Sequence, residues 1–180
     1  REKAPNAATA EMYQDSNGMV IPKATLVGPL ASGIPGLPAG LVHLSKKYGI
    51  LPLEKSLAPA IELAENGFPV FERLITALNV AQQSRGSFSQ KFIEVFTSNY
   101  DSLEVGQLIK QPELANTLRL IASKGHNGFY DSEFTKTMVE EANRDGSIWH
   151  INDFKNYSVI EREPIKLNFM GYELTLAPPP

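Results

Sequence analysis

The side chains that could do acid–base or metal chemistry are few in this chain and lie far apart in the sequence. Its three histidines, His43, His126 and His150, match no recognised metal-ligand spacing, and the chain has no cysteine to supply thiolate ligands or disulfides. His126 follows a predicted helix end, where the helix dipole favours a cation. We interpret all three histidines as structural or solvated, and we expect neither a metal site nor a cofactor.

A serine nucleophile would have to come from a shaped loop, and Ser32 lies in the most shaped loop of the chain. Residues 31–40 contain three glycines and two prolines. The G-x-S-x-G elbow of serine hydrolases is absent, so we favour turn hydrogen bonding over catalysis for Ser32. The glycine spacing also matches neither G-x-G-x-x-G nor the P-loop, which leaves a conformational loop. We assign no catalytic residue within this chain.

The densest late cluster of carboxylates is Glu161-Arg162-Glu163. On a predicted strand, Glu161 and Glu163 share one face and Arg162 points to the other. A solvated strand face or a local ion pair explains this cluster as well as acid–base catalysis does, and the spacing alone is no glycosidase signature. Arg1, taken by itself, is a charged residue on the surface.

Composition limits the classes of function. The chain has 180 residues, 42% hydrophobic and 21% charged, which fits one globular domain. A net charge of −3 gives no electrostatic footprint for nucleic acid or an anionic membrane. No apolar run is long enough to span a membrane. Because Arg1 opens the chain without a methionine and the prolines 178–180 follow a predicted strand directly, we expect residues 1–180 to be one partial domain of a longer protein.

The elements that would position these side chains are mostly helices. Glycine, proline and apolar periodicity predict a fold that is mainly α with a small C-terminal β portion (α+β). We expect a short helical piece at Ala7–Tyr13, and Asn152 and Asp153 to cap a turn around Phe154. The predicted helices are Leu37–Tyr48, Leu53–Asn66 (kinked at Pro59 or starting near it), Phe71–Ser84, Phe88–Phe96, one from Pro112 to Gly125, and one capped by Asp131 or Ser132 that buries Phe134, Met138 and Ala142. Two strands, Val159–Phe169 and Tyr172–Ala177, should form a hairpin around Met170-Gly171.

Several motifs resemble the large subunit of a gamma-glutamyltranspeptidase. They are Arg1–Pro5, Ala31–Gly36, Tyr48–Leu53, Pro59–Phe68, Phe129-Tyr130, Tyr157, Glu161–Ile165 and the final prolines. Their order and spacing over nearly the whole chain carry the resemblance. Residues 85–110 match least, and Pro38 and His150–Asn152 depart from the family pattern.

The resemblance implies the helical part of an αββα N-terminal-nucleophile hydrolase whose precursor cuts itself into a large and a small subunit. Such enzymes cleave gamma-glutamyl amides such as glutathione and transfer the gamma-glutamyl group to water, amino acids or peptides. Their nucleophile is the N-terminal threonine of the small subunit, a partner beyond this chain, so the segment alone is expected to be inactive. The resemblance also implies a periplasmic or extracellular location.

One site residue carries over from the family. In the Arg-Glu-x-Ala-Pro motif the arginine binds the α-carboxylate of the gamma-glutamyl group, and its counterpart is Arg1. A guanidinium forks onto a carboxylate with two parallel hydrogen bonds, which lysine cannot reproduce. As the first residue of the chain, Arg1 is also expected to fray.

Two other functions compete with this one. The first is a cephalosporin or glutaryl acylase of the same superfamily, against which Arg1 is expected to favour gamma-glutamyl donors. The second is a non-enzymatic helical binding domain, which predicts a well-packed monomer. The hydrolase instead predicts an apolar face left uncovered where the central sheets would sit.

Overall fold

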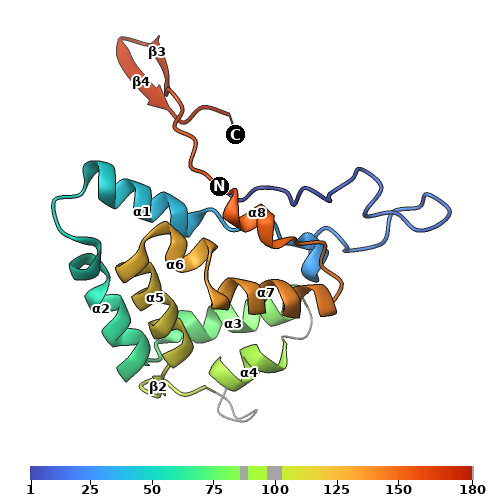
Figure 1. The fold of residues 1–180 in the computed structure, drawn as a ribbon, viewed down its shortest axis with the longest axis horizontal. Helices are drawn as coiled ribbons and strands as arrows, with labels where there is room; N and C mark the ends of the chain where they lie inside the picture. The colour runs from blue at the N-terminus through green and yellow to red at the C-terminus, as the bar shows by residue number, and fades with distance from the viewer. Residues whose placement is uncertain (86–88, 97–102, 180) are drawn as a thin grey trace.

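The computed structural model of the chain describes residues 1–85, 89–96 and 103–179. Figure 1 shows the helices gathered in one body, with the residues before the first helix running outward as a long irregular arm.

The predicted short helix at Ala7–Tyr13 is wrong, because this stretch forms successive turns. The predicted helix start at Phe88 and the last proline, Pro180, lie outside the described residues. The elements, in order, are η1 (Pro29–Ala31), α1 (Leu37–Tyr48), α2 (Leu53–Asn66), β1 (Phe68–Pro69), α3 (Glu72–Arg85), α4 (Gln90–Phe96), β2 (Leu108–Ile109), α5 (Pro112–Lys124), α6 (His126–Tyr130), α7 (Glu133–Arg144), α8 (Ile151–Lys155), β3 (Ile165–Phe169) and β4 (Tyr172–Leu176).

Helices α1, α2 and α5 begin and end where proline and glycine predict. Pro38 lies in the first turn of α1, where a backbone N–H would have no partner within the helix, so the missing N–H of proline costs nothing. At the other end of α1, the N–H of Gly49 donates to the Ser45 carbonyl. Pro59 lies inside α2, so the alternative that this helix starts near Pro59 is wrong. α2 packs along α5, which ends at Gly125 and turns there into α6.

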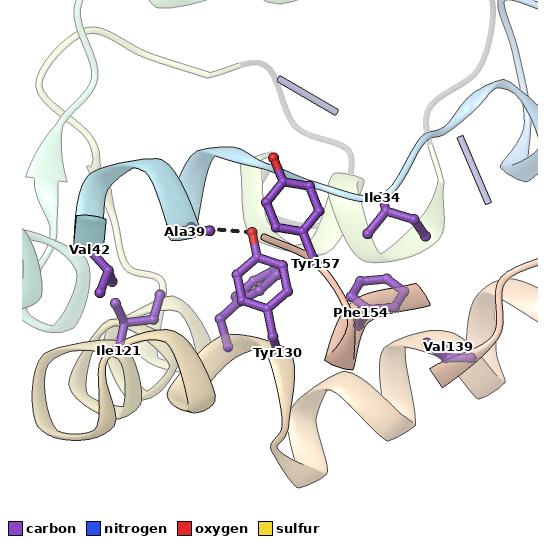
Figure 2. Packing of buried hydrophobic residues seen from close by; sticks show 9 residues of the cluster. Ile34, Ala39, Val42, Ile121, Tyr130, Val139, Phe154 and Tyr157 are labelled. Carbon is purple, nitrogen blue, oxygen red and sulfur yellow. Dashed lines mark hydrogen bonds between the residues drawn. The ribbon is translucent and has the colours of Figure 1, made fainter. Parts of the chain in front are cut away.

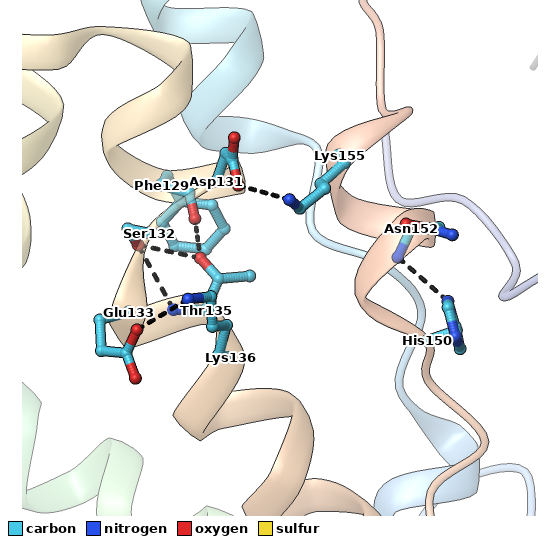
Figure 3. A network of polar contacts seen from close by, with 9 residues as sticks. All are labelled: Phe129, Asp131, Ser132, Glu133, Thr135, Lys136, His150, Asn152 and Lys155. Atoms are coloured by element: carbon cyan, nitrogen blue, oxygen red, sulfur yellow. Dashed lines mark hydrogen bonds and ion pairs between the residues drawn. The ribbon is translucent and has the colours of Figure 1, made fainter.

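The face that α7 buries differs in part from the predicted one: Met138 packs half-buried against the core and Ala142 is half-buried, but Phe134 is exposed. Its N-terminus is capped by Ser132, whose hydroxyl accepts the N–H of Thr135 at 3.3 Å. Thr135 and Val139 are buried, whereas Phe134 is 38% exposed, so the predicted burial of Phe134 is wrong. The Thr135 hydroxyl donates to the carbonyl of Phe129 in α6, and this contact turns the Thr135 side of α7 toward the core (Figure 3).

The core lies where α6, α7 and α8 meet α1 and the loop before it (Figure 2). Tyr130 and Phe154 are fully buried at its centre. The Phe154 ring packs edge-on against Trp149 with the ring centres 5.4 Å apart. The buried cluster comprises Ile34, Ala39, Val42, Ile121, Phe129, Tyr130, Val139, Phe154 and Tyr157.

The predicted C-terminal hairpin is present, with a shorter first strand. Met170 and Gly171 both have positive φ, 50° and 83°, as a tight two-residue turn requires. Ile165 pairs with Leu176 at the open end, and among the described residues no strand pairs with residues 159–164. This is why β3 begins at Ile165 and the predicted start at Val159 is wrong. Figure 1 shows the hairpin projecting away from the helices.

One face of α1 is apolar and uncovered. Its inner face buries Ala39 and Val42, while four large side chains, at spacings of three or four residues, are 49–71% exposed on the outside. These four, the α1 stripe, are Leu37, Leu41, Leu44 and Tyr48. Contiguous exposed apolar patches are typical of interaction surfaces. Among the residues that the structure describes, none of the helices is both long and apolar enough to cross a membrane.

Candidate functional site

The main chain of Arg1 is anchored in the structure. The hydroxyl of Tyr157 donates a 2.6 Å hydrogen bond to the Arg1 carbonyl oxygen. Two residues on, Lys3 and Ile34 exchange both main-chain hydrogen bonds, at 3.1 and 2.7 Å. Contrary to the expected fraying, three hydrogen bonds therefore hold this segment against the rest of the fold, while the Arg1 residue itself stays exposed to solvent.

Helix α8 holds the same segment at a second place. The buried carboxylate of Asp153 accepts the N–H of Asn6 at 3.1 Å and the N–H of His150 at 2.9 Å. His150 in turn caps α8, since its Nδ1 accepts the N–H of Asn152 at 3.2 Å (Figure 3). The cap is thus His150, with Asp153 reaching back to it; the predicted cap by Asn152 is wrong. The structural role inferred for His150 is confirmed.

The loop that pairs with the Arg1 segment is held by aromatic side chains. The indole N–H of Trp149 donates to the Ser32 carbonyl at 3.0 Å. The hydroxyl of Tyr130 donates to the Pro35 carbonyl at 2.6 Å. The same hydroxyl accepts the N–H of Ala39 at 3.2 Å (Figure 2). The Ser32 N–H also donates to the Pro29 carbonyl at 3.2 Å, which confirms the turn hydrogen bonding predicted for Ser32. Burial raises the pKa of Tyr130 to about 12, so this hydroxyl stays neutral and able to donate.

Tyr130 and Tyr157 form one stacked unit with His126. The two tyrosine rings lie 5.2 Å apart and nearly parallel, at 11° (Figure 2). The His126 ring stacks on Tyr130, with the two ring centres 4.4 Å apart. The Nε2 of His126 lies 3.0 Å from the main-chain carbonyl oxygen of Tyr157. Because a carbonyl can only accept, Nε2 carries the proton in this contact. His126 is therefore structural, as inferred from the sequence.

Gly36 is required where the Arg1 segment meets Tyr157. A Cβ built on Gly36 would overlap both the Arg1 carbonyl oxygen and the Tyr157 hydroxyl. The φ of Gly36 is −107°, which any residue can adopt, so the requirement is one of space. Glycine allows the two main-chain segments to approach closely enough for the hydroxyl to bridge them.

Glu161 forms a long-range ion-pair cluster with α1. Its carboxylate lies 2.5 Å from His43 Nε2 and 2.5 Å from Lys47 Nζ, so the third histidine also has a structural partner. Hydrogen bonds from Lys47, and then from His43, lower the pKa of Glu161, which keeps it ionised and unsuited to donate a proton at neutral pH. Glu161 and Glu163 precede β3, so the prediction that they share a strand face is wrong. The ion pair is real but joins residues 114 apart and is not local.

Among the candidate site residues, the structure brings together His43 and Glu161, in the ion-pair cluster with Lys47. The hydrogen-bond partners of His43, His126 and His150 are a glutamate and two main-chain groups. Within residues 1–85, 89–96 and 103–179, no group of three or more His, Cys, Asp or Glu side chains is placed to hold a metal ion. The guanidinium of Arg1 is exposed on an anchored main chain, and a guanidinium is a group that can fork onto a carboxylate.

Reasoning from the sequence missed the residues that support Arg1. In the sequence, Tyr130 and Tyr157 stand out only through the family resemblance, and Trp149, the only tryptophan of the chain, belongs to none of its motifs. A buried tyrosine or tryptophan generally finds a partner for its polar end, which was the available signal. The identity of that partner could not be read from the sequence.

Comparisons with known proteins give one family. The family model described as gamma-glutamyltranspeptidase matches residues 1–180. A glutathione hydrolase proenzyme of Pseudomonas sp. (strain A14) is 35% identical over 100% of this chain, which covers 31% of that relative. The solved gamma-glutamyltranspeptidase of Helicobacter pylori matches with a TM-score of 0.92 and 34% identity, over 99% of this chain and 51% of that one. A cephalosporin acylase from Bacillus halodurans matches with a TM-score of 0.84 and 28% identity, over 99% of this chain and 34% of that one.

Proposed function

The chain belongs to the gamma-glutamyltranspeptidase family, and we propose that the complete protein cleaves gamma-glutamyl amides such as glutathione. The gamma-glutamyl group then passes to water or to the amino group of an amino acid or peptide. This chain spans about a third of the length of its curated relatives and contributes a segment of the large subunit. The observation that carries the proposal is the exposed Arg1 on a main chain held by Tyr157 and by Ile34.

The role of Arg1 is to orient the donor. Its guanidinium forms two parallel hydrogen bonds to the α-carboxylate, which fixes the far end of the gamma-glutamyl group. The amide to be cleaved is then presented to the small-subunit threonine in a geometry close to attack. The threonine oxygen bonds to the amide carbon, the C–N bond breaks, and the amine leaves with a proton. Water or an acceptor amine attacks the resulting ester and releases the threonine.

The test is Arg1→Lys in the complete, self-processed protein. Lysine keeps the charge but loses the fork, and a hydrogen bond to a charged group contributes about 1.5–3 kcal/mol. We expect KM for L-γ-glutamyl-p-nitroanilide to rise by about tenfold or more. Arg144→Lys, the same change at an exposed arginine on α7, is the matched control and should leave KM unchanged. Wild-type kinetics in Arg1→Lys would refute the assignment of Arg1.

The acylase is retained as a second candidate because the solved cephalosporin acylase shares this fold over 99% of the chain. Arg1 does not separate the two functions, contrary to the expectation from the sequence. A glutaryl group carries a carboxylate at the same distance from the amide as a gamma-glutamyl group and lacks only the α-amino group. Comparing hydrolysis of L-γ-glutamyl and glutaryl p-nitroanilides by the complete protein decides between them, and preference for the glutaryl amide would favour the acylase.

The partner that we propose is the remainder of the same precursor, including its small subunit. Support comes from the α1 stripe, in which Leu37 is 71% and Tyr48 64% exposed, the uncovered apolar face expected of a hydrolase segment. We also propose a periplasmic or extracellular location, which rests on the family alone and is tested by assaying gamma-glutamyl transfer in cell fractions.

A further inference from the structure

We propose that Tyr157 is a positioning residue for Arg1, fixing the main chain from which the guanidinium reaches the donor carboxylate. The inference rests on the proposed function and goes beyond it, since it assigns a role to a residue that does not touch the substrate. The contact that carries it is the 2.6 Å hydrogen bond from the Tyr157 hydroxyl to the Arg1 carbonyl oxygen.

The ring of Tyr157 is placed independently of Arg1. It stacks on Tyr130, and the Tyr157 carbonyl accepts from His126 at 3.0 Å. Tyr157 is only 8% exposed, so its ring belongs to the core while its hydroxyl reaches the edge of the core. The hydroxyl therefore offers a fixed donor to which the main chain of Arg1 binds.

The element that carries Tyr157 is itself braced. α8 ends two residues before Tyr157, and an ion pair of 2.9 Å joins its Lys155 to Asp131 at the end of α6 (Figure 3). From the same helix, Asp153 accepts the N–H of Asn6. The Arg1 segment is thus held at its first residue by Tyr157, at Asn6 by α8, and between these two points by the pairing of Lys3 with Ile34.

This arrangement separates positioning from stability. Tyr157→Phe removes one oxygen but keeps the stacked ring, so the core loses little. The Arg1 carbonyl loses its fixed donor, and Gly36, packed against this contact, has no side chain to supply another. The main-chain position from which the Arg1 side chain extends is then less well fixed, so its guanidinium binds the donor carboxylate more weakly. The reaction at the distant amide is not affected.

The test is Tyr157→Phe in the complete, self-processed protein. A neutral hydrogen bond contributes modestly, so we expect KM for L-γ-glutamyl-p-nitroanilide to rise about threefold to tenfold while kcat stays within about twofold. For 4-aminobutyryl-p-nitroanilide, which lacks the α-carboxylate, kcat/KM should not change. Tyr13→Phe is the matched control, because its hydroxyl also donates to a carbonyl, that of Leu30 at 3.1 Å, away from Arg1. It should leave both donors unaffected.

A double variant shows whether Tyr157 acts through Arg1. If it does, Tyr157→Phe changes kcat/KM by less than about twofold in an Arg1→Ala background, because residues in one network are not additive. Equal losses for both donors, or additive losses in the double variant, overturn the proposal in favour of a structural role. If Tyr157→Phe does not fold, Gly36→Ala displaces the two groups that the same hydrogen bond joins. It should lower kcat/KM for L-γ-glutamyl-p-nitroanilide and leave kcat/KM for 4-aminobutyryl-p-nitroanilide unchanged.

The outcomes for the two proposals are distinguishable. A raised KM in Arg1→Lys with wild-type kinetics in Tyr157→Phe overturns only the role of Tyr157. Wild-type kinetics in Arg1→Lys with a raised KM in Tyr157→Phe removes Arg1 from the carboxylate site and also refutes a role of Tyr157 through Arg1.

Discussion

Replacing Gly36 with alanine tests whether the position of the Arg1 main chain controls donor binding. Gly36 lies just before α1, beside the hydrogen bond between the Arg1 carbonyl and the Tyr157 hydroxyl, and a Cβ there overlaps both groups. The φ of Gly36 suits alanine, so Gly36→Ala strains no backbone angle. Its effect is a displacement of the two groups that the hydrogen bond joins.

The size of the effect follows from the overlap. Real Cβ atoms essentially never come within 3.0 Å of another heavy atom, so the Arg1 carbonyl or the tyrosine must retreat. A retreat of about 1 Å breaks the hydrogen bond and misplaces Arg1, and misplacements of that size cost up to roughly 100-fold in rate. We therefore expect kcat/KM for L-γ-glutamyl-p-nitroanilide to fall by about 10- to 100-fold, or about 1.4–2.7 kcal/mol.

The assay is steady-state kinetics of the complete, self-processed protein, with circular dichroism to confirm folding. Gly40→Ala is the matched control: the same substitution one turn further along α1, with nothing in the described chain within 4 Å of the new Cβ. Alanine inside a helix is favoured over glycine by about 0.5–1 kcal/mol, so this variant should be as stable or more stable, with unchanged kinetics. Wild-type kcat/KM in a folded Gly36→Ala protein would refute the reasoning.

Two further predictions concern stability of the complete protein. Phe154→Ala empties a fully buried site and should cost about 3–5 kcal/mol, seen as a lower urea midpoint; an unchanged midpoint would mean that this core is not essential. Lys47 and His43 lower the pKa of Glu161. The ionised Glu161 therefore stabilises the folded protein at a pH above 4.5, the usual pKa of a glutamate, and this stabilisation is lost as the pH falls through the lowered pKa. The urea midpoints of wild type and Glu161→Gln should therefore differ near neutral pH and converge in acid, while Glu163→Gln tracks wild type throughout; a difference that persists in acid would contradict this.

Local rules were sufficient for most helix ends. Gly49 and Gly67 end α1 and α2 as predicted, because a glycine after the last apolar turn favours leaving the helix. The hairpin turn at Met170-Gly171 was predictable for the same kind of reason, since a glycine readily takes positive φ. These features depend on residues a few positions apart, which sequence reasoning can weigh.

Local rules failed where a distant partner decides. The apolar spacing of α7 favoured burial of Phe134, but the hydrogen bond from Thr135 to Phe129 selects the neighbouring face. The strand predicted from Val159 has the residues of a strand, yet β4 is too short to pair with that part of it. In both cases the local pattern was compatible with two outcomes, and tertiary contacts selected one.

The candidate site divides in the same way. The sequence by itself determined most of the helices, because these depend on residue type and short spacing. The order of motifs along nearly the whole chain carried the family resemblance, and only that resemblance pointed to Arg1 as the residue that binds the donor carboxylate. Only the tertiary structure decided what holds Arg1 in place. Tyr157 binds it from 156 positions away, and Asp153 binds Asn6 from 147 positions away. Contacts over such separations arise from how α6 and α8 pack against the loop before α1, and no local pattern encodes them.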